Sequence, residues 1–148
     1  MKIYETENFI LESKEKPEIS REEGGHIVIS PKREIKDRTE LIPKEAVELM
    51  RFTIISGKAF KSAMGKQGVE ISRINYQENG NWNPRLHIHL YGRAKDAKSQ
   101  KFGEPFAPGN KPGYKQLTQD DVELIRFEIE ELFKREEFND KKWGLKNN

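Results

Sequence analysis

The chain has 148 residues, of which 34% are apolar and 35% are charged, a composition that suits one compact soluble domain. Cysteine is absent, which excludes disulfides, zinc–thiolate sites and cysteine nucleophiles. No apolar run approaches the roughly 18 residues that cross a bilayer, and glutamates occupy the place where a signal peptide would have its apolar stretch. We therefore expect a cytoplasmic protein without a membrane anchor.

The net charge is only +2, but the charges are unevenly distributed. Residues 1–23 carry four Lys or Arg against seven Glu, whereas residues 92–116 carry six Lys or Arg against two acids. A basic segment beside a candidate site favours an anionic ligand such as phosphate. A plain solvated loop explains the same composition equally well, so both interpretations stay open.

The first half of the chain alternates between strand and helix patterns. Two short apolar runs, "NFILES" at 8–13 and "HIVIS" at 26–30, predict a pair of antiparallel strands joined by a long polar turn. Pro43 is a good first-turn residue, and the apolar residues after it recur at spacings of three and four. This pattern predicts an amphipathic helix over residues 43–64.

Two further strands follow this helix. In "GVEISRINY", residues 68–76, the apolar positions change faces, which indicates a bulge near Arg73. In "RLHIHLY", residues 85–91, apolar and polar residues alternate strictly. If the aliphatic side chains face the core, the opposite face presents Arg85, His87, His89 and Tyr91.

The C-terminal third has no strand pattern. Residues 92–116 contain seven Gly or Pro and no periodicity, which predicts a long irregular loop. Thr118 and Asp121 form a capping-box-like start for a helix over residues 119–137, after which we expect the chain to fray. The whole chain, residues 1–148, is predicted to be a single α+β domain with a mostly antiparallel sheet, one central helix and a C-terminal helix.

Two imidazoles at positions i and i+2 of a strand project from the same face, and three roles are compatible with them. They are partly exposed sheet residues without a task, or they join His26 as three nitrogen ligands of a metal, although no acidic or thiolate ligand lies beside them. The third role is phosphoryl or nucleotidyl transfer, because a neutral imidazole is nucleophilic near pH 7. Such transfer needs fixed donors for the phosphate oxygens.

The segment "RLHIHLYGR" resembles the signature of the histidine triad (HIT) superfamily, His-φ-His-φ-His-φ-φ, where φ is apolar. The segment "HIVISPKRE" is similar to the upstream strand of that family, which begins with His and continues through apolar residues to Pro and basic residues. The order of elements between them also agrees. The resemblance covers about residues 8–93, and it leaves residues 94–148 as an extension made of the basic loop and the C-terminal helix.

The resemblance implies a nucleotide-binding hydrolase or nucleotidyl transferase. Such an enzyme acts at the α-phosphate of nucleotide conjugates or dinucleoside polyphosphates through a covalent intermediate on His87, as a homodimer and without a metal or other cofactor. By position, His89 would contact the phosphate oxygens and His26 would buttress the site. The remaining positions that would contact or shape the phosphate and ribose pocket are Asn75, Gly80 and Asn83.

The chain departs from the family pattern at Arg85, which stands where the first histidine of the triad would be. The family uses the main-chain carbonyl of this position to orient the nucleophile, and an arginine has the same carbonyl. Its guanidinium could also bind phosphate in a bidentate manner. The alternative is a non-catalytic nucleotide- or RNA-binding module on a degenerate HIT-like fold. The acid that binds ribose in the family has no clear match, and Glu12 is the candidate.

Three aromatic residues of the basic loop, Phe102, Phe106 and Tyr114, are also candidates for stacking on a base. In that interpretation the loop is a lid over polyphosphate, and in the competing one it wraps the partner subunit. Trp82, in the polar loop before the histidines, either covers a base or staples that loop to the core, with the core favoured.

Overall fold

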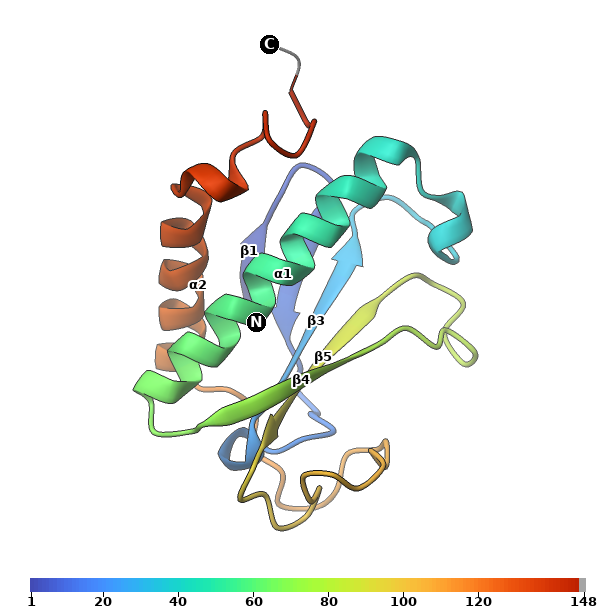
Figure 1. The fold of residues 1–148 in the computed structure, drawn as a ribbon. Helices are drawn as coiled ribbons and strands as arrows, with labels where there is room; N and C mark the ends of the chain where they lie inside the picture. Colours follow the sequence, from blue (N-terminus) through green and yellow to red (C-terminus); the bar gives the residue numbers. More distant parts are fainter. Residues whose placement is uncertain (147–148) are drawn as a thin grey trace.

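A five-stranded antiparallel sheet carries the histidines, with strand order β1-β2-β3-β5-β4. The fold is α+β, and the computed structural model describes residues 1–146. One long helix crosses a face of the sheet and a second helix packs beside it (Figure 1). The elements are β1 (Lys2–Glu5), β2 (Phe9–Ser13), η1 (Arg21–Glu23), β3 (His26–Pro31), η2 (Arg38–Glu40), α1 (Pro43–Lys66), β4 (Ile71–Gln77), β5 (Ile88–Ala94), α2 (Gln119–Phe133) and η3 (Glu136–Phe138).

Both helices begin at the positions that the sequence predicts. Pro43 opens α1, and the Glu45 carboxylate accepts the backbone N–H of Ile42 at 3.1 Å, which satisfies one of the free donors at the helix start. In α2, Thr118 and Asp121 form the expected reciprocal cap, at 3.2 and 2.8 Å. The two start signals are therefore confirmed by the hydrogen bonds that they anticipate.

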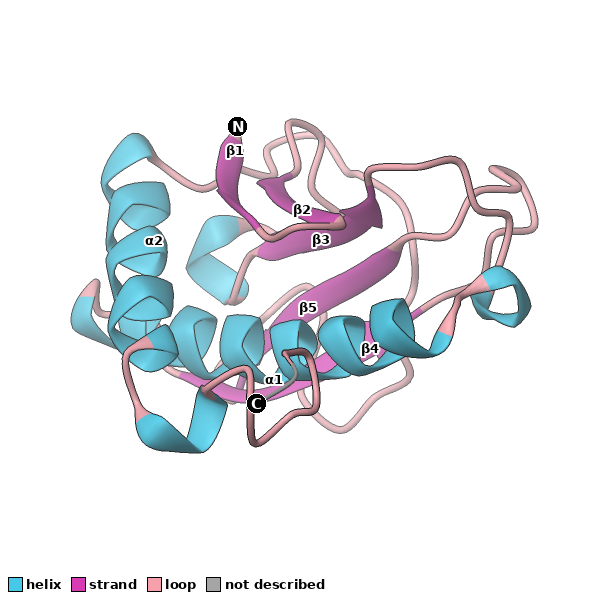
Figure 2. Ribbon diagram, turned by 90° about the horizontal axis from the view of Figure 1, so that it is seen from above, coloured by secondary structure: helices cyan, strands magenta, loops and turns pink. Residues whose placement is uncertain are grey.

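The hydrophobic core lies between α1 and one face of the sheet. Phe52, Ile55 and Phe60 of α1 are fully buried in one cluster with Ile27 of β3 and Leu90 of β5. Helix α2 packs against α1 and β1 (Figure 2). Since successive side chains of a strand point to opposite faces, burial of these aliphatic residues turns the histidines of β3 and β5 to the other face.

Several local expectations are confirmed and others are wrong. The register shift between Ile71 and Arg73 is the expected bulge. Strand β1 was not expected, and the chain carries it because Ile3, only 1% exposed, joins the core. The preference for a core contact of Trp82 is wrong, since that ring is 95% exposed.

The sequence predicts that the chain frays after α2, and the structure shows an ordered segment there instead. The helix ends earlier than expected, at Phe133, and a short 3₁₀ turn then buries Phe138. Arg51, on α1, explains this order because its Nη1 donates to the Phe138 carbonyl at 2.9 Å and to Asp140 at 2.8 Å. The part of this prediction that concerns residues 147–148 lies outside the described residues.

Of the loop predicted over residues 92–116, residues 92–94 belong to β5 and residues 95–116 are irregular. This irregular segment is attached to the rest of the domain at several points. The Glu23 carboxylate accepts the backbone N–H groups of Lys98, Ser99 and Gln100, at 2.8, 2.8 and 3.2 Å. The Asn110 amide donates to the Pro17 carbonyl at 2.7 Å. These contacts place the loop next to the sheet face that carries the histidines.

The chain between η1 and β3 approaches β5 so closely that only glycine fits. A Cβ atom on Gly92 would lie 2.5 Å from the Gly24 carbonyl oxygen, and Gly24 itself has a φ of 132°. The Gly92 N–H also donates to the Gly25 carbonyl at 3.0 Å. This contact fixes the start of β3, where His26 is the first residue.

Over residues 1–146, no helix is long and apolar enough to span a membrane.

Candidate active site

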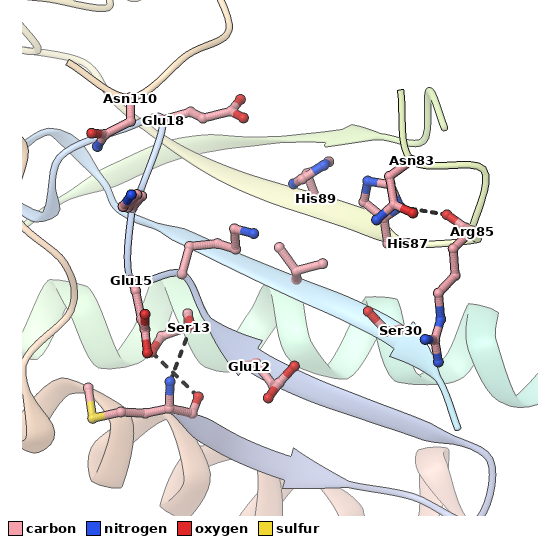
Figure 3. A pocket seen from close by; sticks show the side chains of 14 residues that line it. Glu12, Ser13, Glu15, Glu18, Ser30, Asn83, Arg85, His87, His89 and Asn110 are labelled. Carbon is pink, nitrogen blue, oxygen red and sulfur yellow. Dashed lines mark hydrogen bonds between the residues drawn. The ribbon is translucent and has the colours of Figure 1, made fainter. Parts of the chain in front are cut away.

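His87 is oriented by the main chain of the residue two positions before it. Its Nδ1 lies 2.6 Å from the carbonyl oxygen of Arg85 (Figure 3). A carbonyl oxygen only accepts, so Nδ1 carries the ring proton and Nε2 keeps a free lone pair. The ring is half-buried and lines a pocket. In its neutral form His87 therefore presents the lone pair of Nε2 there.

His89 is held in the opposite tautomer by a chain of two hydrogen bonds. The backbone N–H of Glu18 donates to His26 Nδ1 at 3.2 Å, so the proton of His26 must be on Nε2. That nitrogen lies 2.8 Å from His89 Nδ1, which therefore accepts. The proton of His89 must then be on its Nε2. The imidazoles of His87, just before β5, and of His89, within it, thus have opposite roles, one with a lone pair at Nε2 and one with a donor.

The burial of His26 and His89 keeps their rings neutral. Burial, with His89 adding to it, lowers the pKa of His26 to about 2, and burial with the neighbouring His87 lowers the pKa of His89 to about 4. The hydroxyl of Tyr91 donates to a Glu18 carboxylate oxygen at 2.8 Å, and burial and that carboxylate raise its pKa. At neutral pH His26 and His89 are therefore neutral and Tyr91 is protonated, as the hydrogen bonds require.

The pocket beside these rings has a volume of about 570 Å³, which accommodates a nucleotide-sized ligand. The strand register places Glu12 of β2 opposite Val28 of β3, Val28 opposite His89 of β5, and His89 opposite Gln77 of β4. This row crosses four strands on one face. Because neighbouring strands lie about 4.8 Å apart, Glu12 is roughly 10 Å from His89 across the sheet.

Of the residues singled out from the sequence, five lie at or next to this pocket. Arg85, His87, His89 and Asn83 line it, as does Glu12. His26 does not line it, since it is 1% exposed and contacts the site through His89. The side chain of Arg85 extends toward Ser30, and its Nη2 lies 3.4 Å from the Pro31 carbonyl (Figure 3).

The structure does not bring Asn75 and Gly80 to this pocket. Asn75 is in register with Tyr91, and its side-chain oxygen accepts from Arg93 Nη1 at 2.7 Å, beside a different pocket. Gly80 has a φ of 67°, so it serves the turn between β4 and β5.

The pocket also includes residues that sequence reasoning missed, among them Ser13, Lys14, Glu15, Glu18, Ser30 and Asn110. Lys14, Glu15 and Glu18 come from the polar turn after β2, which looks like an ordinary solvated connection in the sequence. Ser30 is the exception, because it follows His26 by four residues on one strand face. Strand alternation alone would have identified it.

The irregular loop contributes to the site through aromatic stacking. The Phe106 ring packs on Tyr91 with centroids 4.1 Å apart, and Tyr91 stacks on His89 at 5.3 Å. Phe106 therefore packs against the sheet. Phe102, in contrast, is 40% exposed and lines the pocket near Asn75.

The described residues 1–146 contain no group of three His, Cys, Asp or Glu side chains arranged to hold a metal ion. Both ring nitrogens of His26 are engaged in hydrogen bonds, and Nδ1 of His87 and of His89 are engaged as well. Two imidazole nitrogens remain free, whereas a zinc site has three or four protein ligands.

Comparison with solved structures gives the same fold in several bacterial and archaeal proteins. A hypothetical histidine triad nucleotide-binding protein from Sulfolobus tokodaii is 20% identical, with a TM-score of 0.62 over 89% of this chain and 85% of that one. A histidine triad protein from Bradyrhizobium japonicum is 16% identical, with a TM-score of 0.64 over 87% and 90%. A zinc-bound histidine triad family protein from Mycobacterium smegmatis is 19% identical, with a TM-score of 0.56 over 88% and 84%.

No curated protein matches the chain. The family model described as the HIT domain matches residues 1–96, which span β1 to β5 and include all three histidines. This range contains the sheet, α1 and most of the pocket, whereas the loop after β5 and α2 lie outside it. On this match, the chain belongs to the HIT domain family.

Proposed function

We propose that the protein hydrolyses or transfers a nucleotidyl group at the α-phosphate of a nucleotide conjugate or dinucleoside polyphosphate. The opposite tautomers of His87 and His89 carry this proposal. Their ring centroids are 4.7 Å apart at the same pocket, so one phosphoryl group would reach both. A free lone pair is what a nucleophile needs, and an N–H donor beside it is what a phosphate oxygen needs.

In the first step, His87 Nε2 forms a bond to the α-phosphorus while the bond from phosphorus to the leaving group breaks. The His87 Nδ1–H, directed to the Arg85 carbonyl, stabilises the positive charge that develops on the ring. The His89 Nε2–H donates to a non-bridging phosphate oxygen, and the Arg85 guanidinium is a second donor at the rim. In the second step, water or another acceptor attacks phosphorus, the P–N bond breaks and His87 is restored.

The test is a His87→Ala variant assayed with a nucleoside phosphoramidate and a dinucleoside polyphosphate. We expect turnover to be lost while nucleotide affinity, measured by calorimetry, stays within about threefold. The native protein should also form an acid-labile adduct with the mass of one nucleotidyl group. Phe127→Ala is the matched control, because it removes a half-exposed ring from α2, outside the pocket. An unchanged rate in His87→Ala would exclude the assignment.

A non-catalytic nucleotide- or RNA-binding module is the second candidate, and Arg85 at the first triad position favours it. It predicts saturable binding without product or adduct. For RNA, the side chains to change are Lys95, Lys98 and Lys101, because replacing all three with Gln keeps the backbone contacts of the loop with Glu23. Loss of RNA affinity and of its salt dependence, with mononucleotide affinity retained, would indicate RNA binding.

Family membership also supports a homodimer. An apolar depression of about 510 Å³ lies beside β4, the open edge of the sheet, and Met50 and Tyr76 at this depression are 58% and 50% exposed. A second copy related by a two-fold axis would cover this surface and pair β4 with its own copy in antiparallel fashion. Met50→Glu should therefore give monomers in sedimentation experiments. A native chain that sediments as a monomer would exclude this part of the proposal.

A further inference from the structure

A second pocket, of about 370 Å³, lies on the histidine face of the sheet beyond Tyr91. The register pairs Arg73 of β4 with Arg93 of β5, and Asn75 with Tyr91, so these side chains share the face of His89. Arg93 follows His89 by four residues, which corresponds to roughly 13 Å along the strand. The Tyr91–Phe106 stack stands between the two pockets.

The two arginines of this pocket have no acidic partner. Neither takes part in any ion pair found among residues 1–146. Arg93 is only 5% exposed, and its Nη2 donates to main-chain carbonyls, including that of Lys101 at 2.9 Å. Its Nε is buried and has no hydrogen-bond partner. A buried charge without a counter-charge is costly, and like charges opposite each other on neighbouring strands add to that cost.

The hydrogen-bond donors at this pocket suit an anion with several oxygens. Because the Asn75 side-chain oxygen accepts from Arg93, its NH₂ group is directed elsewhere and stays available as a donor. Arg73 is exposed and adds a guanidinium fork, which matches phosphate geometry. Glu104 also lines the pocket, and its carboxylate opposes an anion. Two guanidinium groups against one carboxylate leave a net positive charge.

We propose that this pocket binds a phosphate group, with Arg73 and the Asn75 amide as its ligands and Arg93 as the buried positive charge behind them. Phe102, exposed at the rim beside Gly103, offers an apolar surface for the rest of the ligand. The phosphate comes either from the far end of a polyphosphate whose near end lies at the histidines, or from a separate phosphate ester. The binding needs no chemistry at His87, so it is independent of the proposed reaction.

The test uses the His87→Ala protein, which removes the proposed nucleophile, titrated with inorganic pyrophosphate and followed by NMR of backbone and side-chain amides. We expect the signals of Gly103 and the Asn75 side chain to shift in a saturable manner. Arg73→Gln should weaken this binding about tenfold, the lower range for a hydrogen bond to a charged group, because Arg73 is exposed. Glu104→Gln should strengthen it. Signals of Gly103 and Asn75 that do not move would overturn the proposal.

Arg135→Gln is the matched control, because it removes the same charge near the end of α2, outside the pocket. It should leave pyrophosphate binding unchanged, and equal effects of the two arginine variants would also overturn the site. Thermal unfolding of Arg73→Gln should occur at or above the temperature of the parent protein, because the substitution removes the repulsion with Arg93. A folded variant with weaker binding then reports on the pocket itself.

Two nucleotide ligands distinguish the sources of the phosphate. If one substrate spans both pockets, Arg73→Gln weakens a dinucleoside tetraphosphate about tenfold and leaves a nucleoside monophosphate unaffected. If the phosphates are separate, two monophosphates bind to each chain and Arg73→Gln weakens the second about tenfold. One monophosphate per chain, with neither ligand affected by the substitution, would exclude the pocket as a phosphate site. The NMR signals of His89 report on ligand binding at the first site. A failure of the proposed function would therefore be seen separately from a failure of the second pocket.

Discussion

His26 is the residue through which the surrounding fold sets the tautomer of His89, and His26→Phe is the substitution that tests this link. Phenylalanine keeps a planar ring in a position that is 1% exposed and lies beside the Tyr91 ring, with centroids 4.5 Å apart. The substitution removes the acceptor for the Glu18 N–H and the donor to His89 Nδ1. At pH 7.5 we expect a loss of about 1–3 kcal/mol in the free energy of unfolding, since a buried N–H loses its partner.

The pH dependence makes this prediction sharper. The pKa of His26 is about 2 in the folded state and about 6.5 in the unfolded state, so only the unfolded chain binds a proton between these values. The stability that His26 contributes by staying neutral is complete above pH 6.5 and is lost as the pH falls. At pH 5 this loss amounts to about 2 kcal/mol. Carboxylates hardly titrate between pH 6.5 and 5 in the unfolded chain, so the histidines dominate this window.

Urea unfolding at pH 7.5 and at pH 5 measures the effect directly. The native protein should lose stability over this interval, and His26→Phe should lose about 2 kcal/mol less, so that the difference between the two proteins narrows or disappears at pH 5. Nitrogen-15 NMR of the imidazoles should place the His89 proton at Nε2 in the native protein and distribute it over both nitrogens in the variant. An equal difference in stability at both pH values would refute the argument, because His26 would then titrate normally.

Two further substitutions, with one control in α1, test the backbone geometry around the site. Gly92→Ala should destabilise the fold by about 3 kcal/mol in urea unfolding, because its Cβ would clash with the Gly24 carbonyl. Gly65→Ala, on the open surface of α1, is the control and should stabilise the fold by about 1 kcal/mol. Arg85→Ala keeps the carbonyl that holds His87 Nδ1–H, so NMR should find the same tautomer, while the Kd for a nucleoside monophosphate rises about tenfold through loss of the guanidinium. A changed tautomer would contradict this division of roles.

Most of the fold follows from local patterns in the sequence. Pro43, the Thr118–Asp121 cap and the alternation in residues 85–91 each predict an element that the structure contains, although the strand of that alternation, β5, runs from Ile88 to Ala94. Strand β1 could not be predicted, because a four-residue segment of mixed polarity becomes a strand only by pairing with β2. The ordered structure of the segment after α2 was not predicted for a similar reason. It depends on contacts between Arg51 and residues more than 80 positions away.

The part of the site that lies within one short segment of the sequence was predictable. The part that is brought together by the pairing of separate strands was not. His87, His89 and Arg85 lie within five residues of one alternating pattern, which predicts that they share a face, although β5 itself begins only at Ile88. Glu18 and Gln77 reach the same site from other segments, through the main-chain contact with His26 and the pairing with His89. Asn75 was assigned to the phosphate pocket by position, but the register places it beside Tyr91, next to the pocket of the two arginines.

Arg85 illustrates how a site keeps one function of a residue when the side chain changes. The contact that orients His87 comes from the backbone, and every amino acid supplies that carbonyl. What constrains position 85 is therefore the conformation of the chain before β5. The Leu86 N–H helps to hold that conformation by donating to the Ile35 carbonyl at 2.7 Å, beneath a side chain that is 2% exposed. The side chain of residue 85 is then free to vary, and an arginine there adds a positive charge at the rim of the pocket without disturbing the orientation of His87 behind it.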